Sequence, residues 1–317
     1  MQVKTLALLR VLGCLCLGLW SAVAAAVGLG EAQVIDAGLM VLPPLHAGPP
    51  PDGGANVIVL HGNRRSLIFG TGQAYRDGRQ ILDLVRLERL PDPYMAFIPA
   101  ALPGYVFGGT ALQHGGVALA DTGATGDLIN QRCDHCLERL RASDGNEAMA
   151  GSAVPVADVA LMGEIRIDLG GRMVQVMDMG WAAVPGELAL FDEATGTLVT
   201  AELVVGQGLP QLRDAHLDGW LQALDRIEAL APKRIVPGRG GVLPPSAIAC
   251  TRDYLVNVGK QVRNAYARGL SLSEAENELK LPGATPDEAR VHSSNVQVLY
   301  LQMEKADLGA EASAPLR

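Results

Sequence analysis

Aromatic and basic residues are both scarce in this sequence, and each shortage narrows the classes of protein it could be. Only 4% of the 317 residues are aromatic although 49% are hydrophobic, so aliphatic side chains must fill the core. The net charge is −8 at pH 7, and no long basic run is present. Because affinity for nucleic acid depends on neutralising phosphates, the sequence predicts no nucleic-acid partner. The chain is long enough for a large core and one or two domains.

Residues 1–26 have the pattern of a signal peptide. Lys4 and Arg10 give the chain a positively charged N-terminal region, and residues 11–23 form an apolar stretch that is shorter than a transmembrane helix needs. Small residues at 21–26 offer cleavage sites of the Ala-x-Ala kind. Cleavage changes the net charge from −8 to −10, since it removes Lys4, Arg10 and no acid. We therefore expect a periplasmic or secreted protein with no stable membrane span. Lipid attachment at Cys14 and an uncleaved anchor are the alternatives.

Cleavage would leave three cysteines, two of which form the short motif Cys133-Asp-His-Cys136. In an exported protein such a pair predicts a local disulfide, and two reduced thiols are the alternative. A zinc knuckle needs two further ligands nearby, and only His135 is available. Leu137 stands where a c-type haem motif requires histidine, so that motif is excluded.

Hydrophobic periodicity predicts two successive α/β halves and a helical tail. Strands are expected at 56–61, 66–69, 94–98, 117–121, 164–169, 173–177, 188–191, 198–201 and 233–236, and helices at 76–88, 126–141 and 216–231. After Pro244-Pro245 the pattern becomes helical, with Ser271 and Glu274 forming a capping box. We expect helices from Ser246 to about residue 268, from 271, and at 295–304.

These halves predict two sheets packed face to face with helices outside, a four-layer αββα sandwich. The expected divisions are a signal peptide at 1–26, the sandwich at 27–243, a C-terminal helical extension at 244–306 and a frayed tail at 307–317.

The stretch from Phe97 to Gly109 lies where an α/β protein usually places its chemistry, after the carboxyl end of a strand. Yet residues 99–104 contain no nucleophile, acid, base or metal ligand. The loop therefore has the expected position of an active site without its chemical groups.

In order and spacing, several motifs resemble the metallo-β-lactamase superfamily, in particular its exported members linked with quinoprotein dehydrogenases. The matching segments are 56–59 for the first core strand, 68–72 for the "IDTG" turn, 103–108 for the end of "HPDHVFG", 185–188 with 198–202 for the strands before the bridging aspartate, and 235–240 for "PGHG". The segment from Val291 to Val296 fits the same subgroup. The resemblance implies the αββα fold and, in functional members, a zinc-dependent hydrolase.

The residues that hold zinc in that family are replaced here. The eight motif positions fall at Gly70, Ala100, Leu102, Gly104, Tyr105, Ala183, Glu202 and Arg239. Alanine, leucine and glycine have no side-chain donor, and two weak donors, Tyr105 and Glu202, do not make a zinc site. Arg239 would place a fixed positive charge where the cation should be, and we expect it to pair with Glu202 or Glu187.

A different alignment does not restore the ligands. The six histidines are His46, His61, His114, His135, His216 and His292, and no two are spaced as a metal-binding pair. We therefore predict no metal site, no zinc and no other cofactor.

Three functional hypotheses remain. The first is a non-catalytic pseudoenzyme that serves as a binding or accessory protein, linked to a periplasmic quinoprotein dehydrogenase or its electron carrier. The second is a metal-dependent hydrolase of ester, thioester or lactam bonds with unorthodox ligands such as Tyr105, Glu187 or Glu202. The third is a module that binds a small anion through Arg239. The expected cleft residues are thus Tyr105, Glu187, Glu202 and Arg239.

Overall fold

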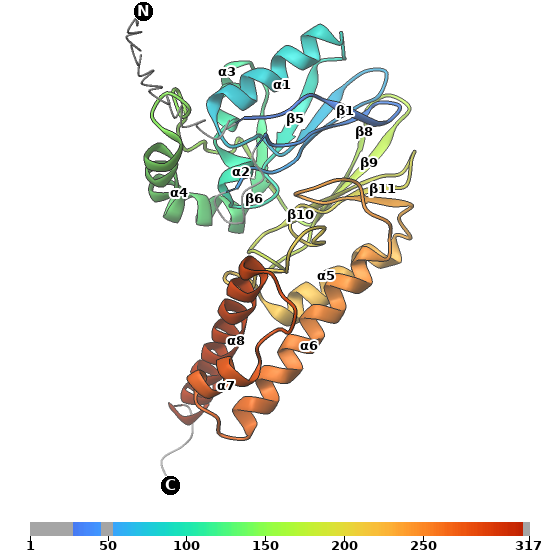
Figure 1. Cartoon of the computed structure of the whole chain (residues 1–317). Helices are drawn as coiled ribbons and strands as arrows, with labels where there is room; N and C mark the ends of the chain where they lie inside the picture. Colours follow the sequence, from blue (N-terminus) through green and yellow to red (C-terminus); the bar gives the residue numbers. More distant parts are fainter. Residues whose placement is uncertain (1–27, 46–52, 313–317) are drawn as a thin grey trace, which may run out of the picture.

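The computed structural model describes residues 28–45 and 53–312 (Figure 1). The predicted signal peptide lies outside these residues. Within the described part, none of the helices is both long and apolar enough to cross a membrane.

Seven strands form the first sheet, in the order β1-β2-β3-β4-β5-β6-β7. They are β1 (Gln33–Asp36), β2 (Leu39–Leu42), β3 (Val57–His61), β4 (Ser66–Phe69), β5 (Pro93–Phe97), β6 (Leu119–Thr122) and β7 (Val159–Leu161). The strands from β1 to β4 pair antiparallel, and those from β4 to β7 pair parallel. The parallel part places the carboxyl ends of β4 and β5 at one edge, where the loop at 98–109 begins.

Four helices accompany this sheet: α1 (Tyr75–Leu87), α2 (Pro103–Val106), α3 (Gly109–His114) and α4 (Gly123–Asp144). The α1 helix turns Ile81, Leu82 and Val85 into the core, as the helical spacing predicts. The short helices α2 and α3 occupy the loop in which the sequence predicted no regular structure. Pro103 at the first position of α2 explains where that helix begins, because proline fits there without losing a hydrogen bond.

Five strands form the second sheet, in the order β12-β11-β10-β9-β8. They are β8 (Glu164–Asp168), β9 (Met173–Asp178), β10 (Leu188–Asp192), β11 (Thr197–Val199) and β12 (Arg234–Val236), with α5 (Leu217–Ala229) between β11 and β12. The β8–β9 hairpin turns at Gly170 and Gly171, which have φ of +98° and +73°. Glycine adopts this left-handed conformation without strain, which lets the chain turn between the strands predicted at 164–169 and 173–177.

Three helices follow the second sheet: α6 (Ala247–Ala267), α7 (Leu272–Glu278) and α8 (Pro286–Ala312). The predicted capping box begins α7, where Ser271 and Glu274 each bind the other's backbone N–H. The last helix is longer than the predicted 295–304, and it continues to Ala312, into the segment 307–317 that was expected to be frayed.

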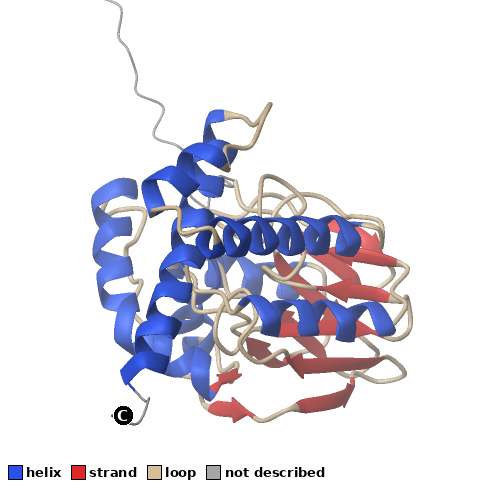
Figure 2. Cartoon of the chain, turned by 90° about the horizontal axis from the view of Figure 1, so that it is seen from below, coloured by secondary structure: helices blue, strands red, loops and turns tan. Residues whose placement is uncertain are grey.

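The fold is the predicted four-layer αββα sandwich with a C-terminal helical extension. In Figure 1 the layers follow one another from α1, through the first and then the second sheet, to α5 and α6. Figure 2, which views the molecule from below, shows helices lying across the face of the nearer sheet. One buried cluster lies mainly around the first sheet, and another lies around α5 and the extension.

The predicted disulfide between Cys133 and Cys136 is not formed in the structure. Both cysteines are free thiols on α4, and 1% and 9% of their surfaces are exposed. They point into the first core cluster, where a reduced thiol packs as a small hydrophobic group. A hydrogen bond with Cys136 and burial raise the pKa of Cys133 far above its usual range, so the thiol stays protonated. Cys250, on α6, is also free and exposed.

Candidate functional site

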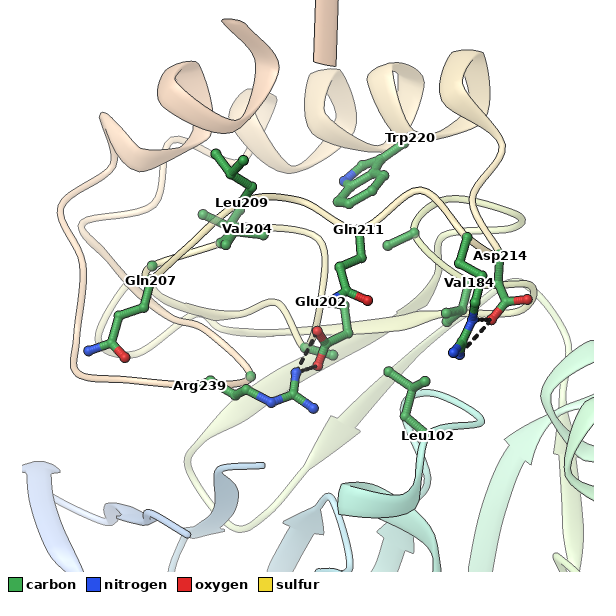
Figure 3. Close-up of a pocket in the computed structure, with 16 residues that line it drawn as sticks. Leu102, Val184, Glu202, Val204, Gln207, Leu209, Gln211, Asp214, Trp220 and Arg239 are labelled. Atoms are coloured by element: carbon green, nitrogen blue, oxygen red, sulfur yellow. Dashed lines mark hydrogen bonds and ion pairs between the residues drawn. The ribbon is translucent and has the colours of Figure 1, made fainter. Parts of the chain in front are cut away.

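Three side chains from distant parts of the chain meet where the two sheets face each other. Arg239 lies in the loop after β12, and its Nη1 donates to both carboxylate oxygens of Glu202, at 2.6 and 2.7 Å. The hydroxyl of Tyr105, on α2, donates to Glu202 Oε1 at 2.9 Å. Figure 3 shows the ion pair at the floor of a pocket. Arg239 therefore pairs with Glu202 rather than with Glu187.

The backbone around this cluster is shaped to let the three side chains meet. A Cβ atom added to Gly238 would come within 2.1 Å of the Tyr105 hydroxyl, so only glycine fits at that position. Gly238 N–H donates to Ala201 O at 2.6 Å. Ala201 itself has φ of +44°, a left-handed conformation that is costly for alanine and that directs the next residue, Glu202, into the site.

Glu187 lies behind Glu202 and is completely buried. Its Oε1 accepts the backbone N–H of Glu202 at 2.7 Å, and its Oε2 accepts that of Ala183 at 3.2 Å. Burial, followed by the charge of Glu202, raises the pKa of Glu187 well above its usual range, and the backbone donors oppose this only in part. Glu187 therefore holds the backbone of Ala183 and Glu202 through both of its carboxyl oxygens, and its burial disfavours a second negative charge beside Glu202.

The remaining charges of the cluster cancel. Burial and the nearby carboxylate of Glu202 raise the pKa of Tyr105, so the phenol stays neutral. Burial disfavours the charge of Arg239, but the Glu202 carboxylate outweighs this and raises the pKa of the guanidinium. One positive and one negative group are thus held together in a largely buried position, with 11% of Arg239 and 15% of Glu202 exposed.

The positions that the sequence resemblance assigned to zinc ligands are filled by packing here. Ala100 is fully buried, and Leu102 and Ala183 are nearly so. Gly104 contacts the chain at 53–55 so closely that an added Cβ would come within 2.9 Å of the Ala55 nitrogen. A side chain at Gly70, where φ is +85°, would be strained, and its Cβ would lie 3.3 Å from Tyr105 Cδ1. Backbone and apolar groups therefore take the place of ligands.

The residues present do not fit zinc. Arg239 already binds both carboxylate oxygens of Glu202, and both oxygens of Glu187 accept backbone N–H groups. A cation in this place would face the fixed positive charge of the guanidinium. Across the described residues, no group of three or more histidine, cysteine or acidic side chains is arranged to hold a metal ion.

Beside the ion pair is a pocket with a cavity volume of about 80 Å³. Leu102 and Ala183 line it from the motif positions, and Trp220 covers it from α5 (Figure 3). Residues 203–214, which connect β11 to α5, form much of the remaining wall. The pocket is therefore formed by elements of both halves of the sandwich.

Solved structures share this architecture. A metallo-beta-lactamase from Pontibacter korlensis superposes with a TM-score of 0.60 at 16% identity, covering 72% of this chain and 99% of its own. TMB-1 gives 0.59 at 16% identity, covering 73% and 98%, and the DIM-1 metallo-beta-lactamase gives 0.56 at 13% identity, covering 72% and 99%. The chain has the metallo-β-lactamase fold. A comparison with protein-family models finds no match, and neither does a comparison with curated proteins.

The structure brings together Tyr105, Glu187, Glu202 and Arg239, the four cleft residues that the sequence predicted. It also adds Asn56, whose side-chain nitrogen donates to Pro237 O and Gly240 O, both at 2.9 Å. The sequence marked Asn56 only as the start of a strand, because its partners lie more than 180 residues away.

Proposed function

We propose that this chain is a non-catalytic binding or accessory protein built on a metallo-β-lactamase fold. The observation that carries the proposal is the Glu202–Arg239 ion pair, with Tyr105 as its third member, in the position where this fold holds metal in active enzymes. A permanent cation from the protein then replaces the metal cation, and no activated water can form on it. The pocket remains beside the ion pair as a binding surface.

We further propose that the protein acts outside the cytoplasm. The N-terminal pattern of residues 1–26 supports export, and the sequence resemblance supports a link with a periplasmic quinoprotein dehydrogenase or its electron carrier. Co-purification with such a dehydrogenase from the periplasm would support this link, and a cytoplasmic location of the native protein would contradict it.

Metal analysis tests the central part of the proposal. Protein purified after growth in added zinc should hold far less than one zinc per chain at this site, and its thermal unfolding should not change with a chelator. The opposite result is one zinc per chain that is lost in Glu202→Gln, together with hydrolysis of an ester, thioester or lactam that the chelator abolishes. That result would favour the hydrolase hypothesis.

The anion-binding alternative is weakened by the same geometry. The Arg239 guanidinium donates to Glu202 through Nη1 and to Gly53 O through Nη2 at 3.3 Å. An anion that bound Nη1 would therefore have to displace Glu202 and leave a buried carboxylate unpaired. If phosphate or a small carboxylate bound the protein and Arg239→Ala abolished the binding, this alternative would replace the one proposed here.

A further inference from the structure

The charged residues that line the pocket are all paired with each other or with a neighbour. Glu202 binds Arg239 at the floor. At the mouth, Asp214 binds Arg213 at 3.1 Å and Arg132 at 2.7 Å. Figure 3 shows the floor pair and the mouth pair on opposite sides of the pocket. A charged ligand group that entered the inner pocket would lose its water without gaining an unpaired counter-charge.

The rest of the lining is apolar, amide or backbone. Leu102, Val184, Val204, Leu209 and Trp220 provide apolar walls, and Gln207 and Gln211 provide side-chain amides. Among the described residues that line the pocket there is no serine, threonine, cysteine, histidine, lysine or tyrosine. The lining can therefore hold a ligand and donate or accept hydrogen bonds, but it presents no hydroxyl, thiol or amine nucleophile, and its two carboxylates, Glu202 and Asp214, are held in ion pairs.

The wall formed by residues 203–214 is fixed by the helical extension. Asn295, on α8, accepts the N–H of Leu212 at 2.9 Å and donates to Pro210 O at 2.7 Å. Thr251, on α6, accepts the N–H of Val205 at 3.2 Å. These contacts hold a segment without helix or strand in one conformation. The pocket is therefore preformed, which lowers the entropic cost of binding.

We propose that this pocket binds a small uncharged ligand that combines an apolar body with an amide, carbonyl or hydroxyl group. This rests on the proposed function, since a ligand is retained only if the site does not hydrolyse it. The cavity volume of about 80 Å³ admits on the order of five non-hydrogen atoms, and larger ligands would extend through the open mouth. The exposed amide of Gln207 matches the polar group, and the apolar walls match the body.

Three probes of similar size and different charge test the ligand class. Propionamide, propionate and propylamine are titrated into protein with ¹⁵N-labelled tryptophan, and the indole N–H resonance of Trp220 is followed. In the expected mature chain, which begins after residue 26, Trp181→Phe identifies the other tryptophan resonance. Propionamide should shift the Trp220 resonance to saturation and bind at least about tenfold more tightly than either charged probe. Equal or tighter binding of propionate or propylamine would overturn the proposal, as would no binding of propionamide.

Two tryptophan substitutions show whether the binding is in the pocket. Leu209 is part of the pocket wall and only partly buried, so Leu209→Trp should fill the cavity and abolish propionamide binding. Leu301, on the outer face of α8, is 46% exposed, and Leu301→Trp should leave binding unchanged. Loss of binding in both variants, or in neither, would contradict the assignment to this pocket.

Metal analysis of the same samples separates the two proposals. Stoichiometric zinc would overturn the proposed function whether or not the probe binds. A metal-free protein that does not bind propionamide would overturn the ligand assignment alone.

Discussion

Arg239 and Glu202 depend on each other more strongly than two surface residues of opposite charge do. Both are largely buried, and Glu202 accepts the N–H groups of Arg239 and the hydroxyl of Tyr105. Removing one partner leaves the other charge buried without compensation, whereas removing both also removes that cost. Removing one partner of the ion pair should therefore lower the free energy of unfolding strongly, whereas replacing both partners together should lower it much less.

Arg239→Met should lower the free energy of unfolding by about 3 kcal/mol, because it leaves the Glu202 carboxylate unpaired. The double variant Arg239→Met, Glu202→Gln should recover most of that loss. Denaturant unfolding of the single and double variants measures both effects.

The exposed pair Arg64–Asp168 provides the control for this prediction. Its side chains are 70% and 42% exposed, and Arg64→Met should cost less than about 1 kcal/mol. If Arg239→Met cost no more than Arg64→Met, the ion pair would not hold the site together.

The raised pKa of Asp121, near the end of β6, predicts that the protein loses stability as the pH rises from acidic to neutral. Burial, followed by the like charge of Asp127, raises the pKa of Asp121 from 3.8 to about 6. The folded state thus binds the proton more tightly than the unfolded state. The stabilisation is complete below about pH 4 and is lost as the pH rises through about 6. Relative to Asp121→Asn, the wild-type protein should lose on the order of 2 kcal/mol over this range.

Measurement of denaturant unfolding across the same pH range tests this sign. Asp127 is exposed, so Asp127→Asn should leave the fold intact and lower the pKa of Asp121 by removing the like charge. The loss of stability with rising pH should then occur at lower pH in Asp127→Asn than in the wild-type protein. Identical pH profiles for the wild-type protein and Asp121→Asn would contradict the prediction.

At the scale of single residues, the sequence predicted which positions form the site but not how they interact. Arg239 and Glu202 were found because each follows a recognisable strand and turn. That Glu187 has a raised pKa and accepts backbone N–H groups depends on complete burial, which the sequence does not record. The role of Gly104 likewise depends on the segment 53–55 lying against it.

Most elements that were predicted correctly have local signals, and most of those that were missed do not. The β8–β9 hairpin and α7 carry a Gly-Gly turn and a capping box within a few residues. The strands β1 and β7 are short and lie at the edges of the sheet, so only their partners define them. The start of α8 did have a local signal, because Thr285 and Glu288 bind each other's backbone N–H groups, and that signal was overlooked.

The helix α8 determines the shape of the pocket although it does not line it. Asn295→Ala should release Pro210 and Leu212 and weaken propionamide binding at least about fivefold, because the loop must be ordered again on binding. It should also lower the free energy of unfolding by about 2 kcal/mol, since it leaves buried backbone groups unpaired.

Ser293→Ala, on the same helix, is the matched control for Asn295→Ala. Ser293 makes an exposed hydrogen bond with Glu276 and does not contact the loop. Its removal should change neither probe binding nor stability by a measurable amount. Tight propionamide binding in Asn295→Ala would show that the loop holds its conformation without α8.

In the whole molecule, the site also joins the two sheets. Asn56 immediately precedes β3 of the first sheet, and Pro237 immediately follows β12 of the second. The Asn56 backbone N–H donates to Gly238 O at 2.7 Å, and its side chain binds Pro237 and Gly240. The contacts that position Arg239 are therefore contacts between the two halves of the sandwich, so the geometry of the site and the stability of the whole fold are linked.

Asn56→Ala tests this link. The change leaves two buried carbonyl groups without their donor and should lower the free energy of unfolding by about 2–3 kcal/mol. Asn277 on α7 makes one exposed side-chain hydrogen bond. Asn277→Ala should therefore change the free energy of unfolding by less than about 0.5 kcal/mol. If the halves unfold as one unit, hydrogen exchange in Asn56→Ala should show the same loss of protection in β3 and β4 as in β10 and β11. A loss confined to one sheet would mean that the halves are stable independently and that the site does not couple them.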